Sequence, residues 1–130
     1  MALFPSVPSS KALKLLEEWL RKNDASEESI KEYVRLTKLC IVKKFFQFNG
    51  KYYSQKGGLT IGNALSSPLS ELFMSDLEIR VVTHFFWMFR CWLRYVDDIL
   101  CVVKRKFLDD ALKLSNLQEE SLKFTSELEK

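Results

Sequence analysis

The sequence predicts an α+β fold in a single domain, and three of its features carry that prediction. Apolar residues recur at helical spacing over residues 9–39. The pair Asn49-Gly50 separates two short aromatic segments, which is typical of a β-hairpin. Residues 85–103 are rich in aromatic and β-branched side chains and indicate a second hairpin. With 130 residues, 47% of them hydrophobic, the chain is long enough for one domain with a core.

Two helices are predicted first. Residues 9–22 form one, with Ser9 or Ser10 as the N-cap. The other opens at Ser26, where a Ser-Glu-Glu-Ser run resembles a capping arrangement. The apolar residues at helical spacing are Ala12, Leu13, Leu16, Trp19 and Leu20 in the first helix and Ile30, Tyr33, Val34, Leu36 and Leu39 in the second.

The middle of the chain predicts a hairpin followed by a third helix. Segments 45–48 and 51–54 flank the Asn-Gly turn, whose two residues both tolerate a positive φ. A glycine-rich loop over residues 57–62 then leads into a helix over about residues 65–80. The side chains expected to face inward from that helix are Leu69, Leu72, Phe73 and Leu77.

The last third of the chain predicts a strand pair, a helix and a closing strand. The strands lie within residues 85–103 and meet in a tight turn with two acids at its tip. A helix is expected over about residues 107–120 and a short strand over 122–128. The single histidine, His84, is expected in a strand rather than as a catalytic base, because no Cys or acidic partner stands at ligand spacing. The tryptophans expected in the core are Trp19, Trp87 and Trp92.

Positive charge is concentrated in the middle of the chain, although the net charge is only +3. Aromatic residues are interleaved with this basic stretch, which fits a surface facing a polyanion, and a solvated basic face is the alternative. Arg90, Arg94 and residues 104–106 are further candidates for phosphate contacts, with solubility as the alternative. The basic stretch consists of Lys31, Arg35, Lys38, Lys43, Lys44, Lys51 and Lys56.

Cysteine spacing and hydropathy predict a reduced, intracellular protein in the nucleus or the cytoplasm. Cys40, Cys91 and Cys101 lack Cys-x-x-Cys spacing, so they indicate neither a zinc site nor a disulfide framework and are expected to be buried thiols. The longest apolar stretch, residues 81–89, is too short to cross a bilayer, and no signal peptide is visible. No membrane partner is therefore expected.

Two adjacent carboxylates at the tip of an apolar hairpin are the main chemical feature. Charges near such a core are costly unless they are compensated, and a divalent cation would compensate Asp97 and Asp98. Magnesium usually binds through one or two carboxylates plus substrate phosphates. An Asp-Asp turn alone is more often a solvated turn, so the surrounding motif has to decide between the two interpretations.

That motif is Tyr95-Val96-Asp97-Asp98, and with it the chain resembles the reverse transcriptases, whose palm carries Tyr-x-Asp-Asp in a β-hairpin. The resemblance implies that Asp97 is the principal metal ligand and catalytic acid, with Asp98 as the supporting acid. It also implies that Tyr95 lies at the nucleotide and template site.

The segment from Gln55 to Pro68 resembles a second element of the family. In that element a Gln and glycines lead into a helix. In the family this element packs beside the template base and the incoming nucleotide. The motif serine matches Ser66, but the proline expected next arrives one residue late. The resemblance implies that the residues lining the nucleotide and template site here are Gln55, Gly58, Gly62 and Ser66.

A third element at the start of the chain resembles the tail of the family's first catalytic motif, in which an aromatic residue follows an Asp by five positions. Phe4 takes the aromatic position, so its ring would lie under the sugar and favour deoxynucleotides. The metal-binding Asp would stand two positions before Met1. The wording of the motifs is most like the Penelope-like retroelements. Residues 1–130 are thus expected to be one partial domain of fingers and palm, without the first Asp, the full fingers or the thumb.

The resemblance implies RNA-templated DNA synthesis by two-metal nucleotidyl transfer, with two Mg²⁺ ions. The implied partners are an RNA template, a DNA primer and deoxynucleoside triphosphates. Without the first Asp, this chain alone is expected to be inactive. The alternatives are a non-catalytic remnant that binds nucleic acid and an unrelated helical interaction protein.

Overall fold

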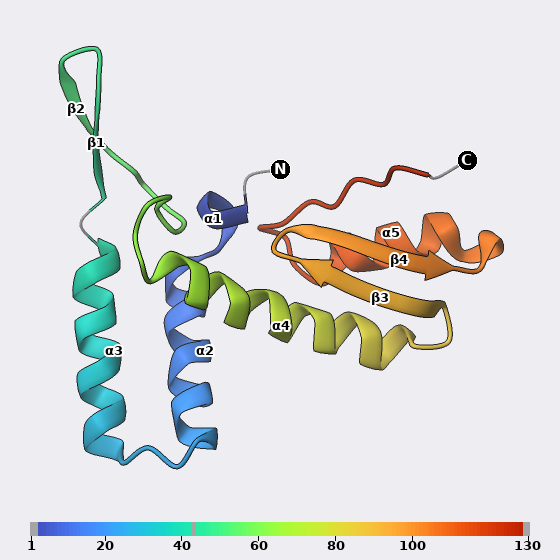
Figure 1. The fold of residues 1–130 in the computed structure, drawn as a ribbon, viewed down its shortest axis with the longest axis horizontal. Helices are drawn as coiled ribbons and strands as arrows, with labels where there is room; N and C mark the ends of the chain where they lie inside the picture. Colours follow the sequence, from blue (N-terminus) through green and yellow to red (C-terminus); the bar gives the residue numbers. More distant parts are fainter. Residues whose placement is uncertain (1–2, 43, 129–130) are drawn as a thin grey trace. The chain divides into compact units, whose positions relative to one another are not determined.

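The α+β fold predicted from the sequence is present in the computed structural model, which describes residues 3–42 and 44–128. The chain divides into two compact units, Ala2–Phe73 and Met74–Lys130, here named the N-terminal unit and the C-terminal unit (Figure 1). The described residues form five α-helices, one 3₁₀ helix and four strands, and the strands pair into two separate antiparallel hairpins. No helix in these residues has the length and apolar character needed to cross a membrane.

Helices dominate the N-terminal unit. A short α1 (Leu3–Ser6) precedes α2 (Ser9–Lys22), which has the predicted bounds, and α3 (Glu27–Val42) packs against α2. The buried apolar residues of these elements and their linker are Leu3, Val7, Ala12, Ile30 and Ile41.

Only one of the two predicted N-caps forms. Ser26 caps α3, because its hydroxyl accepts a hydrogen bond from the backbone N–H of Ser29 at 3.2 Å, and such a cap contributes about 1 kcal/mol. At α2 the cap position is occupied by Pro8 instead of a serine. The hydroxyl of Ser9 donates a hydrogen bond to the carbonyl oxygen of Gly58 at 3.0 Å, so this side chain ties α2 to the loop.

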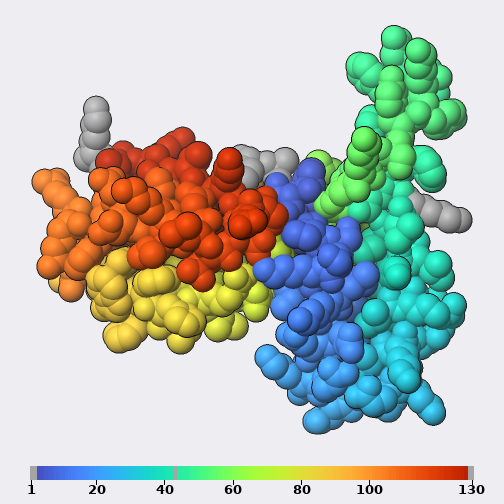
Figure 2. All heavy atoms as spheres, turned by 180° about the vertical axis from the view of Figure 1, so that it is seen from behind, coloured from blue at the N-terminus to red at the C-terminus, as the bar shows by residue number. Residues whose placement is uncertain are grey.

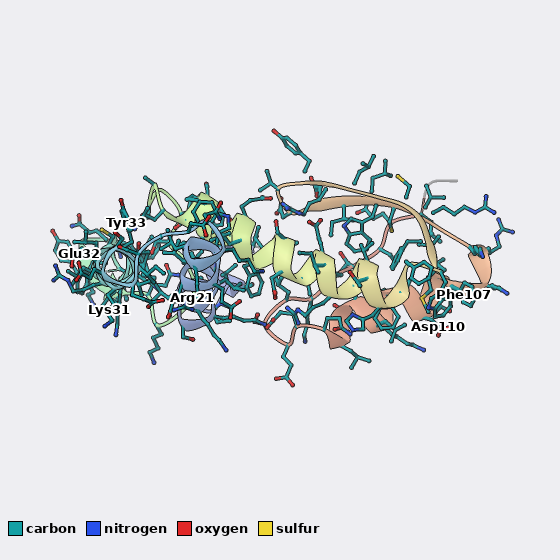
Figure 3. All side chains as sticks on the ribbon, turned by 90° about the horizontal axis from the view of Figure 1, so that it is seen from below. Arg21, Lys31, Glu32, Tyr33, Phe107 and Asp110 are labelled. Atoms are coloured by element: carbon teal, nitrogen blue, oxygen red, sulfur yellow. The ribbon has the colours of Figure 1, made fainter. Side chains whose placement is uncertain are left out.

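The apolar side of α3 is covered only in part. Ile30 is buried, but Tyr33 is 57% exposed and Leu39 is 56% exposed. Figure 3 shows Tyr33 projecting outward from α3. Trp19 on α2 is also half exposed, so its expected place in the core is wrong. In a pair of helices each has one partner, and apolar side chains that point away from it stay uncovered.

The Asn-Gly hairpin is confirmed. Strands β1 (Phe45–Phe48) and β2 (Lys51–Ser54) pair in antiparallel fashion. Asn49 has φ of 50° and Gly50 has φ of 73°, the two positive angles that a type I′ turn requires. Every residue of both strands is exposed, and Figure 2 shows the hairpin, in green, standing clear of the helices of its unit.

Helix α4 (Ser66–Phe85) crosses from one unit into the other and is longer than predicted. Its buried stripe repeats every four residues, which places the stripe on one helical face. His84 lies in the last turn of α4, so its predicted place in a strand is wrong. Pro68 is accommodated in the first turn, where a backbone N–H would have no helical partner. The stripe consists of Leu69, Phe73, Leu77 and Val81.

The second predicted hairpin follows α4 in the C-terminal unit. Strands β3 (Phe89–Tyr95) and β4 (Asp98–Val103) pair in antiparallel fashion, with an irregularity in register after Phe89. The 3₁₀ helix η1 (Arg105–Phe107) leads into α5 (Leu108–Leu117), close to the predicted helix.

Residues 122–128 do not form the predicted closing strand. The side chain of Asn116 occupies the backbone groups that a neighbouring strand would have bound. Its Oδ1 accepts a hydrogen bond from the N–H of Phe124 at 2.6 Å, and its Nδ2 donates to the Phe124 carbonyl oxygen at 3.2 Å. One side chain thus anchors the segment to α5 without a sheet.

Several residues expected in the interior are near the surface. Trp87 is 45% exposed and contacts the ring of Phe107 edge-on, with 5.0 Å between the ring centroids; Phe107 is labelled in Figure 3. Trp92 is partly buried. Cys40 and Cys101 are exposed and Cys91 is partly buried, so the expectation of three buried thiols is wrong.

Candidate functional site

The turn from Tyr95 to Asp98 presents two adjacent carboxylates to solvent. Tyr95 at the end of β3 pairs with Asp98 at the start of β4, and Val96 and Asp97 form the two-residue connection between them. Both aspartates are exposed, and Tyr95 is 81% exposed. The predicted acidic tip is therefore present, and its side chains are open to a ligand.

Val96 gives this turn an unusual backbone. Its φ is 57°, whereas Asp97 is not among the residues with a positive φ, and this combination is that of a type II′ turn, which favours glycine at its first central position. A β-branched residue in the left-handed region is a genuine outlier. Strain of this kind costs on the order of 1–3 kcal/mol and concentrates at functional sites.

The acidic turn supplies part of a metal site. Two carboxylates offer the hard oxygen ligands that magnesium prefers, with substrate phosphates completing its shell. No cluster of three or more His, Cys, Asp or Glu side chains able to hold a metal ion occurs in residues 3–42 and 44–128. Asp97 and Asp98 would therefore need further ligands from a substrate or from another segment.

A polar network behind the turn was not predicted from the sequence. Glu78 of α4 accepts two hydrogen bonds at Oε1, from Trp92 Nε1 at 2.9 Å and from Arg94 Nε at 2.8 Å. Arg94 also donates from a terminal nitrogen to the carbonyl oxygen of Val96 at 3.1 Å. Its side chain is only 9% exposed, so Arg94 is a partner of Glu78 rather than the solvent-facing phosphate contact considered from the sequence.

In the N-terminal unit, the glycine loop (residues 57–62) packs against α1. Gly58 is buried with φ of 73°, and a Cβ at this position would overlap the backbone of Pro5. The N–H of Leu59 donates to the carbonyl oxygen of Phe4 at 2.7 Å. Glycine is thus required at position 58 because the Pro5 backbone of the same chain approaches it closely.

The buried side chain of Lys44 binds the same loop. It is 8% exposed, and its Nζ donates to Ser9 Oγ at 3.0 Å and to the carbonyl oxygen of Gly58. Burial lowers the pKa of its ammonium group. Lys44 therefore does not belong to the basic surface predicted from the sequence, and Lys43 of the same stretch lies outside the described residues.

Gln55 and Ser66 are also engaged within the loop. Gln55 Nε2 donates to the carbonyl oxygens of Gly57 at 2.5 Å and Leu59 at 3.3 Å. Ser66 is buried, and its hydroxyl donates to the carbonyl oxygen of Thr60 at 2.6 Å. In this structure both side chains shape the loop.

The predicted site residues thus fall into two sets. Gly62, with φ of 90°, is exposed, and a Cβ at this position would meet no atom within 4 Å. Phe4 lies on α1 and is partly buried. Phe4, Gln55, Gly58, Gly62 and Ser66 belong to the N-terminal unit, whereas Tyr95, Asp97 and Asp98 belong to the C-terminal unit.

A cavity of about 170 Å³ lies within the C-terminal unit, between the β3–β4 hairpin, α5 and residues 124–127. Its walls are mostly apolar, with Trp92, Ile99 and Leu112 among them. None of the predicted site residues lines it.

Comparison of the chain with protein-family models, curated proteins and solved structures gives no match.

Proposed function

We propose that the chain is part of the palm of a reverse transcriptase that synthesises DNA on an RNA template, of the Penelope-like kind. The observation that supports this most is the exposed Asp97-Asp98 pair at a two-residue hairpin turn. A strained, non-glycine residue beside two solvent-facing acids is difficult to explain by stability alone, because a glycine would form the same turn at lower cost.

The proposed chemistry is nucleotidyl transfer, in which a primer 3′-hydroxyl attacks the α-phosphate of a deoxynucleoside triphosphate and pyrophosphate leaves. Asp97 is the principal ligand for magnesium and Asp98 supports it. Magnesium, when bound, stabilises negative charge on the attacking and leaving oxygens. The carboxylates hold the cations, and their own charge balances that of the metal.

The proposed chemistry uses three acids. The acidic turn contributes two of them, so a third must come from another segment. The sequence resemblance places it two positions before Met1. Nucleotide incorporation is therefore expected only where a third carboxylate joins Asp97 and Asp98 at the metal site.

The residues of the N-terminal unit have separable roles in this proposal. Phe4 contacts the sugar and disfavours a 2′-hydroxyl, and Gly62, which is exposed with open space around it, contacts the template or the nucleotide. Gly58, Gln55 and Ser66 act by shaping the loop, which their contacts with α1 and with loop carbonyls support.

Primer extension tests the proposal. A version of the chain lengthened upstream to include an Asp two positions before Met1 is supplied with an RNA template, a DNA primer, deoxynucleotides and Mg²⁺. Extension is expected, and Asp97→Asn should reduce its rate by at least about a hundredfold. No extension by a lengthened chain that is folded by circular dichroism would contradict the proposal.

Nucleic-acid binding without catalysis is the second candidate, and the β1–β2 hairpin favours it. Phe45, Phe48 and Tyr52 are each at least two-thirds exposed. Lys51 at the start of β2 and Lys56 just after this strand are also exposed. Aromatic rings can stack on unpaired bases while lysines contact phosphates. Binding to single-stranded RNA that weakens with salt, without any extension by the lengthened chain, would favour this candidate.

A further inference from the structure

We propose that Arg94 and Glu78 are positioning residues that hold the Tyr95–Asp98 turn in its strained shape, so that the two carboxylates are presented together. The inference rests on the proposed function for its chemical meaning. The structural part of the inference is that α4 controls the shape of the turn, and it is argued only from contacts within the C-terminal unit.

The first part of the network fixes the arginine. Trp92 and Arg94 are two residues apart on β3 and therefore point to the same face of the hairpin. Both donate to Oε1 of Glu78, at 2.9 and 2.8 Å, and α4 runs beside β3 here (Figure 1). The side chains of Arg94 and Glu78 are 9% and 21% exposed, so solvent screens this ion pair weakly.

The second part connects the arginine to the turn. While Nε of Arg94 binds Glu78, a terminal nitrogen of the same guanidinium donates to the carbonyl oxygen of Val96 at 3.1 Å. The guanidinium group is planar and its donors are rigidly arranged. The Glu78 carboxylate on α4 thus orients the guanidinium of Arg94. The orientation of that group in turn sets the direction of the hydrogen bond that the Val96 carbonyl oxygen accepts.

The peptide that joins Val96 to Asp97 is where the turn is under strain. Val96 has φ of 57°, and relaxation to a negative φ would rotate the peptide that precedes the Asp97 carboxylate. A hydrogen bond to the Val96 carbonyl oxygen opposes this rotation. Arg94 therefore acts on the acids through the backbone, without needing to touch a substrate.

NMR spectroscopy of the 130-residue chain tests this. A positive φ brings the amide and α protons of one residue close together, so Val96 should give a strong intraresidue NOE. Arg94→Lys keeps a charge that can pair with Glu78 but lacks the planar fork, and the NOE should fall by about twofold or more. Arg90→Lys, at an exposed position on the same strand, is the matched control and should leave the NOE unchanged.

A rescue separates positioning from general damage. Arg94→Lys should also weaken the cross-strand NOE between Tyr95 and Asp98, the pair that flanks the turn. Glycine adopts a positive φ readily, so adding Val96→Gly to Arg94→Lys should restore that NOE. The indole N–H signal of Trp92 reports whether the fold and the contact with Glu78 persist.

Metal binding provides the functional readout. Mn²⁺ should broaden the signals of Asp97 and Asp98 in the wild-type chain, and Arg94→Lys should require about tenfold more Mn²⁺ for the same broadening. No broadening in the wild-type chain would count against the proposed function, whereas the NOE comparison would still decide the positioning role. An undiminished Val96 NOE in the Arg94→Lys chain would overturn that role.

Discussion

Gly58 packs so closely on Pro5 that a Cβ at residue 58 would overlap the Pro5 backbone. The contact joins the glycine loop to α1 within the N-terminal unit, and the hydrogen bond from Leu59 to Phe4 lies next to it. The loop that the sequence marks as a nucleotide-binding element is therefore held by the start of the chain. Changes at this contact should affect the stability of the unit before they affect any ligand.

Gly58→Ala should lower the free energy of unfolding by about 2–4 kcal/mol, because it adds a steric overlap to a left-handed backbone. Urea denaturation followed by circular dichroism measures the loss. Gly57→Ala is the matched control, since a Cβ at Gly57 would meet no atom within 4 Å and its φ is not positive. Equal stabilities of the two variants would contradict the packing described here.

Lys44 should give the stability a distinctive dependence on alkaline pH. Its folded pKa is lowered by burial from the usual 10.5. Between the lowered value and 10.5 the unfolded chain binds more protons than the folded chain, so the free energy of unfolding rises with pH in that window. Denaturation at several alkaline pH values should show a smaller rise in Lys44→Met than in wild type. Lys51→Met, at an exposed site, controls for the loss of one charge, and identical slopes in wild type and Lys44→Met would refute the assignment.

Val96→Gly should stabilise the C-terminal hairpin by about 1 kcal/mol, because glycine relieves the positive φ. Most substitutions of valine by glycine in a strand do the opposite. Val102→Gly on β4, where φ is not positive, should therefore destabilise the chain by about 1 kcal/mol. Thermal unfolding of both variants measures the difference, and destabilisation by Val96→Gly would show that the turn is not strained in solution.

Tyr52 should contribute to any binding of single-stranded RNA. It is 77% exposed on β2, and loss of one stacking ring typically costs about 1–3 kcal/mol. Fluorescence anisotropy with a labelled oligonucleotide should show weaker binding by Tyr52→Ala than by Tyr33→Ala, which removes an exposed tyrosine from α3. Equal affinities of the two variants would exclude the hairpin as the binding surface.

Local signals in the sequence predicted the local structure well. The Asn-Gly turn, the helix over residues 9–22 and the Ser26 cap all depend on residues within a few positions of one another. The acidic hairpin formed as predicted for the same reason, since a polar break between two β-rich segments specifies where the chain turns.

Features set by distant residues were missed. The strand predicted over residues 122–128 does not form, because Asn116 binds the backbone of Phe124. Lys44 looked like surface charge but is enclosed by Ser9 and Gly58. The partnership of Glu78 with Arg94 spans 16 positions, which no periodic pattern reveals. The metal, nucleotide and template roles inferred from the family resemblance stay predictions.

The most direct test of the central claim is a crystal structure of the upstream-lengthened chain with primer and template, Mn²⁺ and a non-hydrolysable deoxynucleoside triphosphate. Anomalous scattering locates the manganese. The proposal predicts a manganese ion bound by the Asp97 carboxylate and by triphosphate oxygens. Manganese and triphosphate bound elsewhere, with the Asp97 and Asp98 carboxylates free of both, would contradict it.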